Sequence, residues 1–87
     1  MRYLRYMFTR IHTKVTVAGW FKNNTFIPQK FIWSAQPHAI KQVTLVSEVK
    51  DGGVHHRVYS VMVDSAVFRL DYNRSTEEWW LEEVWCD

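Results

Sequence analysis

Histidine and cysteine are the side chains of this 87-residue chain that could bind a metal ion or start nucleophilic chemistry. His55 and His56 are adjacent, so on a strand they point to opposite faces and cannot bind one ion together. His12 and His38 have no acidic neighbour in the sequence, and Cys86 has neither a glycine-rich loop nor a third orienting group beside it. We therefore predict no metal site, no cofactor and no enzymatic activity.

Two pairs of neighbouring glutamates near the C-terminus are the remaining candidates for catalysis. Glu77-Glu78 and Glu82-Glu83 have the residue type that general acid and base chemistry needs. Nothing nearby in the sequence indicates the burial on which that chemistry depends. We expect all four to be solvated surface charges.

Charge is divided unevenly along the chain. Residues 1–47 contain seven basic residues and no acid, whereas residues 48–87 contain four basic residues and nine acids, so the two parts carry 7 − 0 = +7 and 4 − 9 = −5. This division predicts an anionic partner for the basic half, either nucleic acid or an acidic protein segment. The alternative is that the first and last strands lie side by side and neutralise each other.

Aromatic side chains are interleaved with the basic ones in the first half, a combination typical of proteins that bind single-stranded nucleic acid. Basic side chains contact phosphates, and stacking of a base on an aromatic ring contributes about 1–3 kcal/mol. Our leading hypothesis is a binding module with this kind of site. Its residues would be Arg2, Tyr3, Arg5, Tyr6, Arg10, Lys14, Trp20 and Lys22.

The tryptophans of the acidic C-terminus give the rival hypothesis, a protein-interaction or self-assembly domain. Trp79 and Trp80 are adjacent and cannot both face inward on a regular strand. We assign Trp33 and Trp79 to the core. We expect Trp80 and Trp85 to form an interaction surface, because tryptophan is enriched where proteins meet a partner or a second copy of themselves.

The elements that must position these residues are mostly strands. Between residues 58 and 72, apolar side chains alternate with polar ones on either side of a turn at residues 64–66, which predicts a β-hairpin. The core side chains of this hairpin are expected to be Tyr59, Val61, Phe68, Leu70 and Tyr72.

Two strands are expected in the first third of the chain. The β-branched run 11–18 predicts a strand that ends at Gly19, with a loop at residues 21–24 after it. A second, short strand is expected at residues 30–34, where Phe31 and Trp33 share a face.

The middle of the chain contains one long strand and two turn signals. Residues 35–37 are expected to form a turn, and the alternation of residues 39–50 slips by one position, which indicates a β-bulge or a strong bend. Gly52 and Gly53 supply the positive φ of a tight hairpin turn.

The pattern of residues 77–86 fits either a helix or a bulged strand. Residues 75–78 resemble a capping box, and four apolar residues after them lie on one helical face. The same residues also alternate as a strand interrupted at Glu83. We favour the strand, because a helix would leave the edge of a small sheet without a closing partner.

These elements predict one all-β domain over residues 1–87, with residues 1–10 as a partly ordered basic and aromatic arm. About five or six short strands indicate a small SH3-like barrel or a strongly bent antiparallel sheet. A single cysteine, no secretory signal and no apolar run of about 18 residues indicate a cytoplasmic protein without a membrane segment.

The order of apolar motifs from Pro28 onward resembles a family of small bacterial domains of unknown function. The shared motifs read here as Phe31-Ile-Trp33, Ile40 with Val43, Val58-Tyr-Ser-Val61, Phe68-Arg-Leu-Asp-Tyr72 and Trp79-Trp-Leu81-Glu-Glu-Val84. Family members are often encoded near genes for DNA-damage-tolerance polymerases, so the resemblance implies a nucleic-acid or replication context. Relatives carry Trp-Arg-Gly-Arg where this chain has Trp33-Ser-Ala-Gln36, so two basic side chains are missing from that turn.

Overall fold

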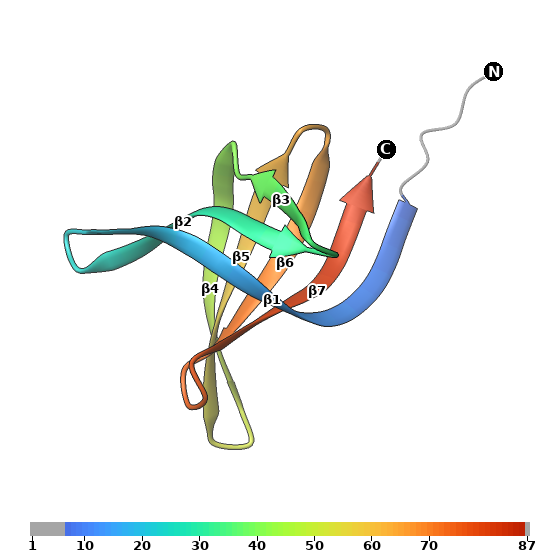
Figure 1. Ribbon diagram of the computed structural model, residues 1–87. Coiled ribbons are helices and arrows are strands. Elements are labelled where there is room, and N and C mark those ends of the chain that lie inside the picture. Colours follow the sequence, from blue (N-terminus) through green and yellow to red (C-terminus); the bar gives the residue numbers. More distant parts are fainter. Residues whose placement is uncertain (1–6, 87) are drawn as a thin grey trace.

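The computed structural model describes residues 7–86, and these residues form strands and turns without a helix. The first six residues of the expected basic arm lie outside the described part. No helix that could cross a membrane occurs among the described residues. Seven strands follow one another along the chain (Figure 1): β1 (Met7–Lys22), β2 (Thr25–Trp33), β3 (Gln36–Ala39), β4 (Gln42–Asp51), β5 (Val54–Val63), β6 (Ala66–Asn73) and β7 (Glu78–Cys86).

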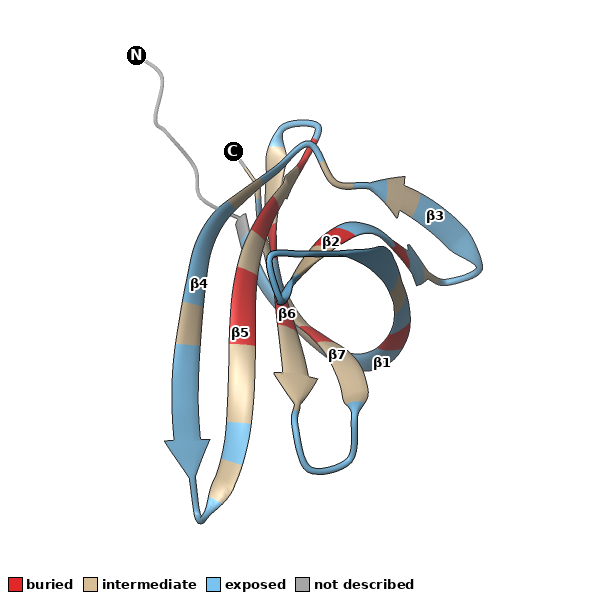
Figure 2. Ribbon diagram, turned by 90° about the vertical axis from the view of Figure 1, so that its left-hand side faces the viewer, coloured by how far each residue is buried: buried red, intermediate tan, exposed pale blue. Residues whose placement is uncertain are grey.

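The seven strands form one antiparallel sheet in the order β3-β2-β1-β7-β6-β5-β4. The long β1 is the centre of this order, because its first part pairs with β7 and its last part pairs with β2. The sheet is strongly curved (Figures 1 and 2), and its outer strands β3 and β4, although consecutive in the chain, do not pair with each other. The all-β prediction is confirmed, whereas the strand number is higher than expected and a closed SH3-like barrel is not confirmed.

Curvature arises where β1 changes partners and register. One register shift falls between Arg10 and Thr13, where His12 has a φ of 51°, and a second falls between Ala18 and Gly19. Bulges of this kind bend a strand and increase its twist. The first shift places an extra residue in β1 and the second places an extra residue, Gln29, in β2, so the two bulges together let the sheet turn back on itself.

Gly19 continues β1 rather than ending it. A Cβ atom at this position would lie 2.2 Å from the backbone oxygen of Ile27 and 2.9 Å from the Cα atom of Pro28. The predicted strand end at Gly19 is therefore wrong, and the loop predicted at residues 21–24 is confirmed only for residues 23–24, because β1 continues to Lys22. The glycine serves the close approach of β2, and the chain reverses only at Asn23-Asn24, whose φ angles are 54° and 63°.

The turn expected at residues 35–37 is placed one or two residues too late. Ser34 and Ala35 have φ angles of 53° and 60° and form the turn, while Gln36–Ala39 is the short strand β3. Neither serine nor alanine is a typical residue for positive φ, so the composition of this turn gave no signal.

Most of the remaining predicted turns and strands agree with the structure, but the second strand, expected at residues 30–34, begins five residues earlier and is β2, Thr25–Trp33. The register shift between Val43 and Leu45 is the bulge expected in the long middle strand, which begins at Gln42. Gly52 and Gly53, with φ angles of 57° and 85°, turn the β4–β5 hairpin. The expected hairpin of residues 58–72 is formed by β5 and β6, and the C-terminal segment is the strand β7 with a register shift against β6.

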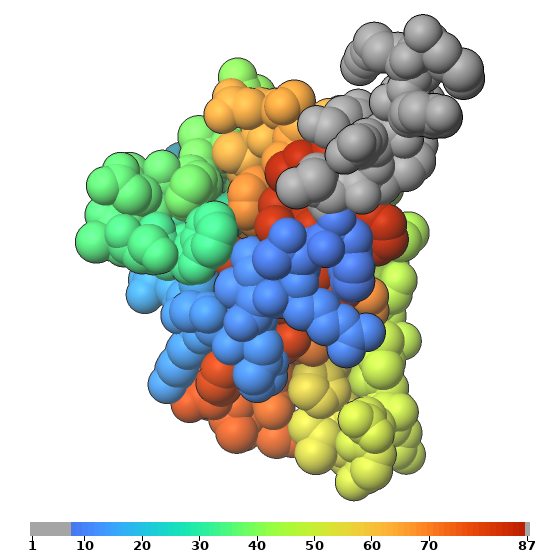
Figure 3. All heavy atoms as spheres, turned by 90° about the vertical axis from the view of Figure 1, so that its right-hand side faces the viewer, coloured from blue at the N-terminus to red at the C-terminus, as the bar shows by residue number. Residues whose placement is uncertain are grey.

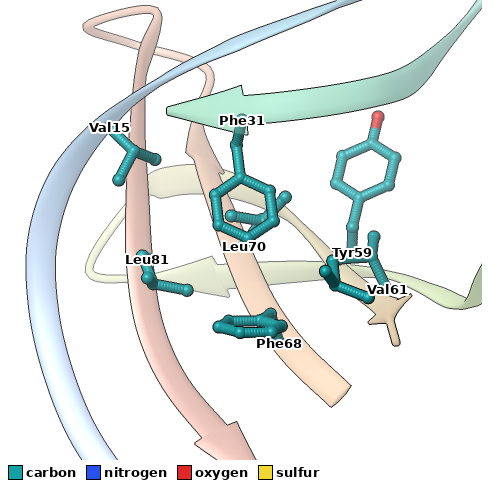
Figure 4. Close-up of a cluster of buried hydrophobic side chains, with 8 residues drawn as sticks. Val15, Phe31, Tyr59, Val61, Phe68, Leu70 and Leu81 are labelled. Atoms are coloured by element: carbon teal, nitrogen blue, oxygen red, sulfur yellow. The ribbon is translucent and has the colours of Figure 1, made fainter. Parts of the chain in front are cut away.

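The core lies on the concave side of the curved sheet. Four of the five predicted hairpin core residues are buried, and the fifth, Tyr72, is half-buried. Phe31 is fully buried, and its ring centroid lies 5.2 Å from that of Phe68. Figure 4 shows Phe31 pointing from β2 toward Leu70 and Phe68 of β6. One side chain thus joins the two arms of the bent sheet.

Replacement of Gly19 by alanine is expected to destabilise the protein by about 1–3 kcal/mol, because the added methyl group must push the backbone of β2 away. Urea unfolding followed by tryptophan fluorescence measures this change. Ala18→Ser, at an exposed neighbouring position, is the matched control and should change stability by less than about 0.5 kcal/mol. Equal stabilities of Gly19→Ala and the control would contradict the assigned role of Gly19.

Candidate functional site

Five aromatic side chains gather at one end of the concave side, and we call them the aromatic groove. The Trp79 ring is central, and its centroid lies 4.8 Å from the ring centroid of Tyr72, 5.3 Å from that of Tyr59 and 5.6 Å from that of Phe26. Phe21 extends the set, 5.3 Å from Phe26, and is 78% exposed at the rim. The rings therefore lead from the buried core out to solvent.

Two neighbouring hollows make up the groove. The larger, of about 530 Å³, contains all five rings, and the smaller, of about 450 Å³, lies between β2 and the strands β4 and β5. Asn24, Phe26, Arg57 and Tyr59 line both hollows, so the two are continuous. We call the smaller hollow, between residues 25–28 of β2 and the facing part of β4, the seam.

The β4 edge of the seam is an unpaired strand edge. Among residues 7–86, β4 pairs only with β5, and Figure 2 shows most of β4 exposed beside the partly buried β5. Val46 is 49% exposed and lines the seam, whereas Val49 is 39% exposed and does not. An edge strand offers a row of free N–H and C=O groups, so this one can pair with another chain.

Charged groups meet at the junction of the two hollows. Glu48 accepts hydrogen bonds from Arg57 Nε and, at 3.4 Å, from Arg74 Nη1. The bond from Arg57 lowers the pKa of Glu48 below its ordinary value of 4.5, and the same contact raises the pKa of Arg57. With Glu77, the groove contains two basic and two acidic side chains and is balanced in charge.

The structure does not bring the predicted nucleic-acid residues into this groove. Arg2, Tyr3, Arg5 and Tyr6 lie outside the described residues. The other four, Arg10, Lys14, Trp20 and Lys22, are all exposed and follow one another along β1. Side chains along a strand point alternately to its two faces. The outer face of β1 carries Lys14, Trp20 and Lys22, because the side chains that alternate with them face the core or the groove.

That outer face also contains acids. Lys14 Nζ donates to Glu78 at 2.8 Å, which lowers the pKa of Glu78, and His12 Nδ1 lies 2.9 Å from Glu82. Figure 3 shows the start of β1, in blue, beside β7, in red. The alternative that the first and last strands lie side by side and pair their charges is therefore confirmed.

The two tryptophans predicted as an interaction surface lie apart from the groove. Trp80 is half-buried and stacks on His12 with ring centroids 4.7 Å apart. Trp79 faces the groove, so the two adjacent tryptophans do not both face inward, as predicted. Trp85 is 43% exposed and packs on Phe8 at 4.6 Å. Trp85 also lines a shallow outer hollow of about 320 Å³.

Histidines and acids form pairs rather than clusters. His56 Nδ1 lies 2.7 Å from Asp71, and His38 stacks on Phe31 with centroids 5.1 Å apart. Within residues 7–86, no group of three His, Cys, Asp or Glu side chains is placed to hold a metal ion. The groove itself presents ring faces, two guanidinium groups and a strand edge.

Sequence reasoning missed the basic part of the groove. Arg57 and Arg74 lie 17 positions apart, and Glu48 reaches both only because β4, β5 and β6 are neighbours in register. The aromatic alternation assigned Tyr59, Tyr72 and Trp79 to the core. No signal in the sequence indicated that their end of the core is open.

Comparisons of the chain with protein-family models, with curated proteins and with solved structures give no significant match. The resemblance to the family of small bacterial domains therefore stays a hypothesis.

Glu48→Gln is expected to lower stability at about pH 7 by no more than about 1 kcal/mol, because the ion pair that it breaks is exposed. The folded-state pKa of Glu48 lies below 4.5, so its stabilisation is present above that pH and is lost as the pH falls through the lower value. The difference in unfolding free energy between Glu48→Gln and wild type should therefore become smaller below pH 4.5.

Urea unfolding at several pH values measures that difference. Glu77→Gln is the control, because this exposed acid has no ion pair among the described residues. If Glu48→Gln lowers stability by the same amount in acid as at neutral pH, the ion pair does not contribute to stability.

Proposed function

We propose that the protein is a non-enzymatic binding module that takes an extended polypeptide segment along the seam. The segment adds as a strand to the free edge of β4 and places apolar side chains in the aromatic groove. One observation carries this proposal: an aromatic groove lies directly beside an unpaired strand edge of ten residues.

Strand addition explains why both features occur together. An added strand gains main-chain hydrogen bonds from the edge, and pockets for alternate side chains supply the specificity. Val46 lines the seam from β4, and Phe26 and Tyr59 continue the apolar surface inward. An extended segment is therefore matched on both its backbone and its side chains.

Charge favours a polypeptide over a nucleic acid. Of the eleven basic and nine acidic residues of the chain, Arg2, Arg5 and Asp87 lie outside the described part, which leaves nine basic and eight acidic residues and a net charge of +1. Lys14, on the outer face of β1, forms an ion pair with Glu78 of β7. Because phosphate contacts need a surplus of positive charge, these surfaces are poor sites for a polyanion.

Single-stranded nucleic acid is the second candidate ligand. It is favoured by the β1–β2 hairpin, where Trp20 is 65% exposed two residues from Lys22 and next to the rim of the groove at Phe21. Bases would stack on the exposed rings, and phosphates would contact Lys22, Arg57 and Arg74.

Peptides selected from a random phage-displayed library on the immobilised full chain test the first candidate. A selected peptide should bind Val46→Lys at least about tenfold more weakly than wild type, because the lysine blocks the seam. Val49→Lys is the matched control on the same strand and should bind as wild type does.

A second arm tests the strand addition itself. Two versions of the selected peptide are made, one N-methylated at its odd-numbered residues and one at its even-numbered residues. Only one of the two versions should lose binding, because alternate amides of an added strand face the sheet. Equal effects in the two versions would overturn the proposal.

Titration with a labelled oligodeoxythymidine of about 20 nucleotides, at about 50 mM and about 200 mM salt, tests the second candidate. Nucleic-acid binding should weaken steeply as salt rises and should be lost in Trp20→Ala. Tight binding of the oligonucleotide together with no peptide selected would replace the first candidate by the second.

A further inference from the structure

We propose that Arg57 and Arg74 form an anchor for an anionic group of the ligand, and that Glu48 occupies this anchor in the free protein. The ligand would carry a carboxylate or a phosphate next to an aromatic or apolar side chain. This inference rests on the proposed function, because it assigns a chemical class to the ligand of the same groove.

The geometry places both arginines where such a group would arrive. Arg57 lines both hollows, and Arg74 lines the larger one together with Tyr72 and Trp79. Glu48 uses one carboxylate oxygen for each arginine. A guanidinium has five N–H donors in a planar fork, so most donors of this pair remain free for a second acceptor.

Glu48 is held weakly enough to be displaced. The side chains of Arg57, Glu48 and Arg74 are 29%, 52% and 50% exposed. Exposed ion pairs contribute little net stabilisation, so an incoming anion that also gains ring contacts competes successfully with Glu48. Two guanidinium groups share the single carboxylate of Glu48, while the fourth charged side chain of the groove, Glu77, makes no ion pair among the described residues.

The ion pair of Arg69 with Glu83 provides a natural comparison. It joins one arginine to one carboxylate, at 3.1 Å, on the outer face of the sheet. Arg69 lies beside none of the groove rings and has its charge fully matched. Arg69→Gln is therefore the matched control for Arg57→Gln and Arg74→Gln.

NMR titration of the ¹⁵N-labelled full chain with four small probes tests the anchor. The probes are 3-phenylpropionate, its uncharged amide 3-phenylpropanamide, phenyl phosphate and inorganic phosphate. We expect 3-phenylpropionate to shift the Trp79 indole N–H and Arg57 Nε–H signals and to bind about fivefold more tightly than the amide, since charge-assisted bonds are the stronger ones. Arg57→Gln and Arg74→Gln should lose this preference, and Arg69→Gln should keep it.

Glu48→Gln gives the sharpest result. Removal of the internal competitor should tighten 3-phenylpropionate binding by about two- to fivefold, the range set by an exposed ion pair, and leave the amide unchanged. A purely structural role of Glu48 predicts the opposite, weaker binding of both probes. Comparison of phenyl phosphate with 3-phenylpropionate then shows whether phosphate or carboxylate is preferred.

The outcomes separate this inference from the proposed function. Equal groove binding of 3-phenylpropionate and its amide would overturn the anchor and leave the groove as a peptide site. No groove shift with any probe, together with no selected peptide, would overturn both. Equal affinity for inorganic phosphate and phenyl phosphate would contradict the pairing of an anion with a ring.

Discussion

The sheet depends on two bulges near its centre, one in β1 between Arg10 and Thr13 and one in β2 at Gln29. Without them the two strands would be straight, and β2 would extend the sheet sideways instead of folding over it. With them, Phe31 of β2 reaches Phe68 of β6 and becomes fully buried. Each aromatic side chain can bury about 150–250 Å², and a chain of this size has few other means of building a core.

The same bending creates the groove. A sheet folded over itself but not closed leaves two unmatched edges, and here β4 faces β2 across the seam without pairing. The connection from β3 to β4 holds one end of the seam, because Ile40 N donates to Gln29 O and Lys41 N donates to Met62 O. At the other end only side chains fill the space, so the aromatic core continues to the surface.

The sequence predicts the features of this fold that depend on neighbouring residues and misses those that depend on contacts between strands. Period-two alternation and the Gly52-Gly53 turn identify β5, β6 and the β4–β5 hairpin, because strand faces and turn conformations are set by near neighbours. Gly19 misleads for a physical reason. A glycine can end a strand or allow another strand to approach closely, and the sequence alone does not distinguish these two roles.

Charge shows the same limit. The acid-free first half and the acid-rich second half indicated a basic site, but β1 and β7 pair in the sheet, so Lys14 meets Glu78 and that part of the outer face becomes neutral. At the unpaired edge of β4, Glu48 instead meets two arginines beside the open end of the aromatic core. Charged and aromatic side chains therefore meet at this place for one reason, the incomplete closure of the sheet.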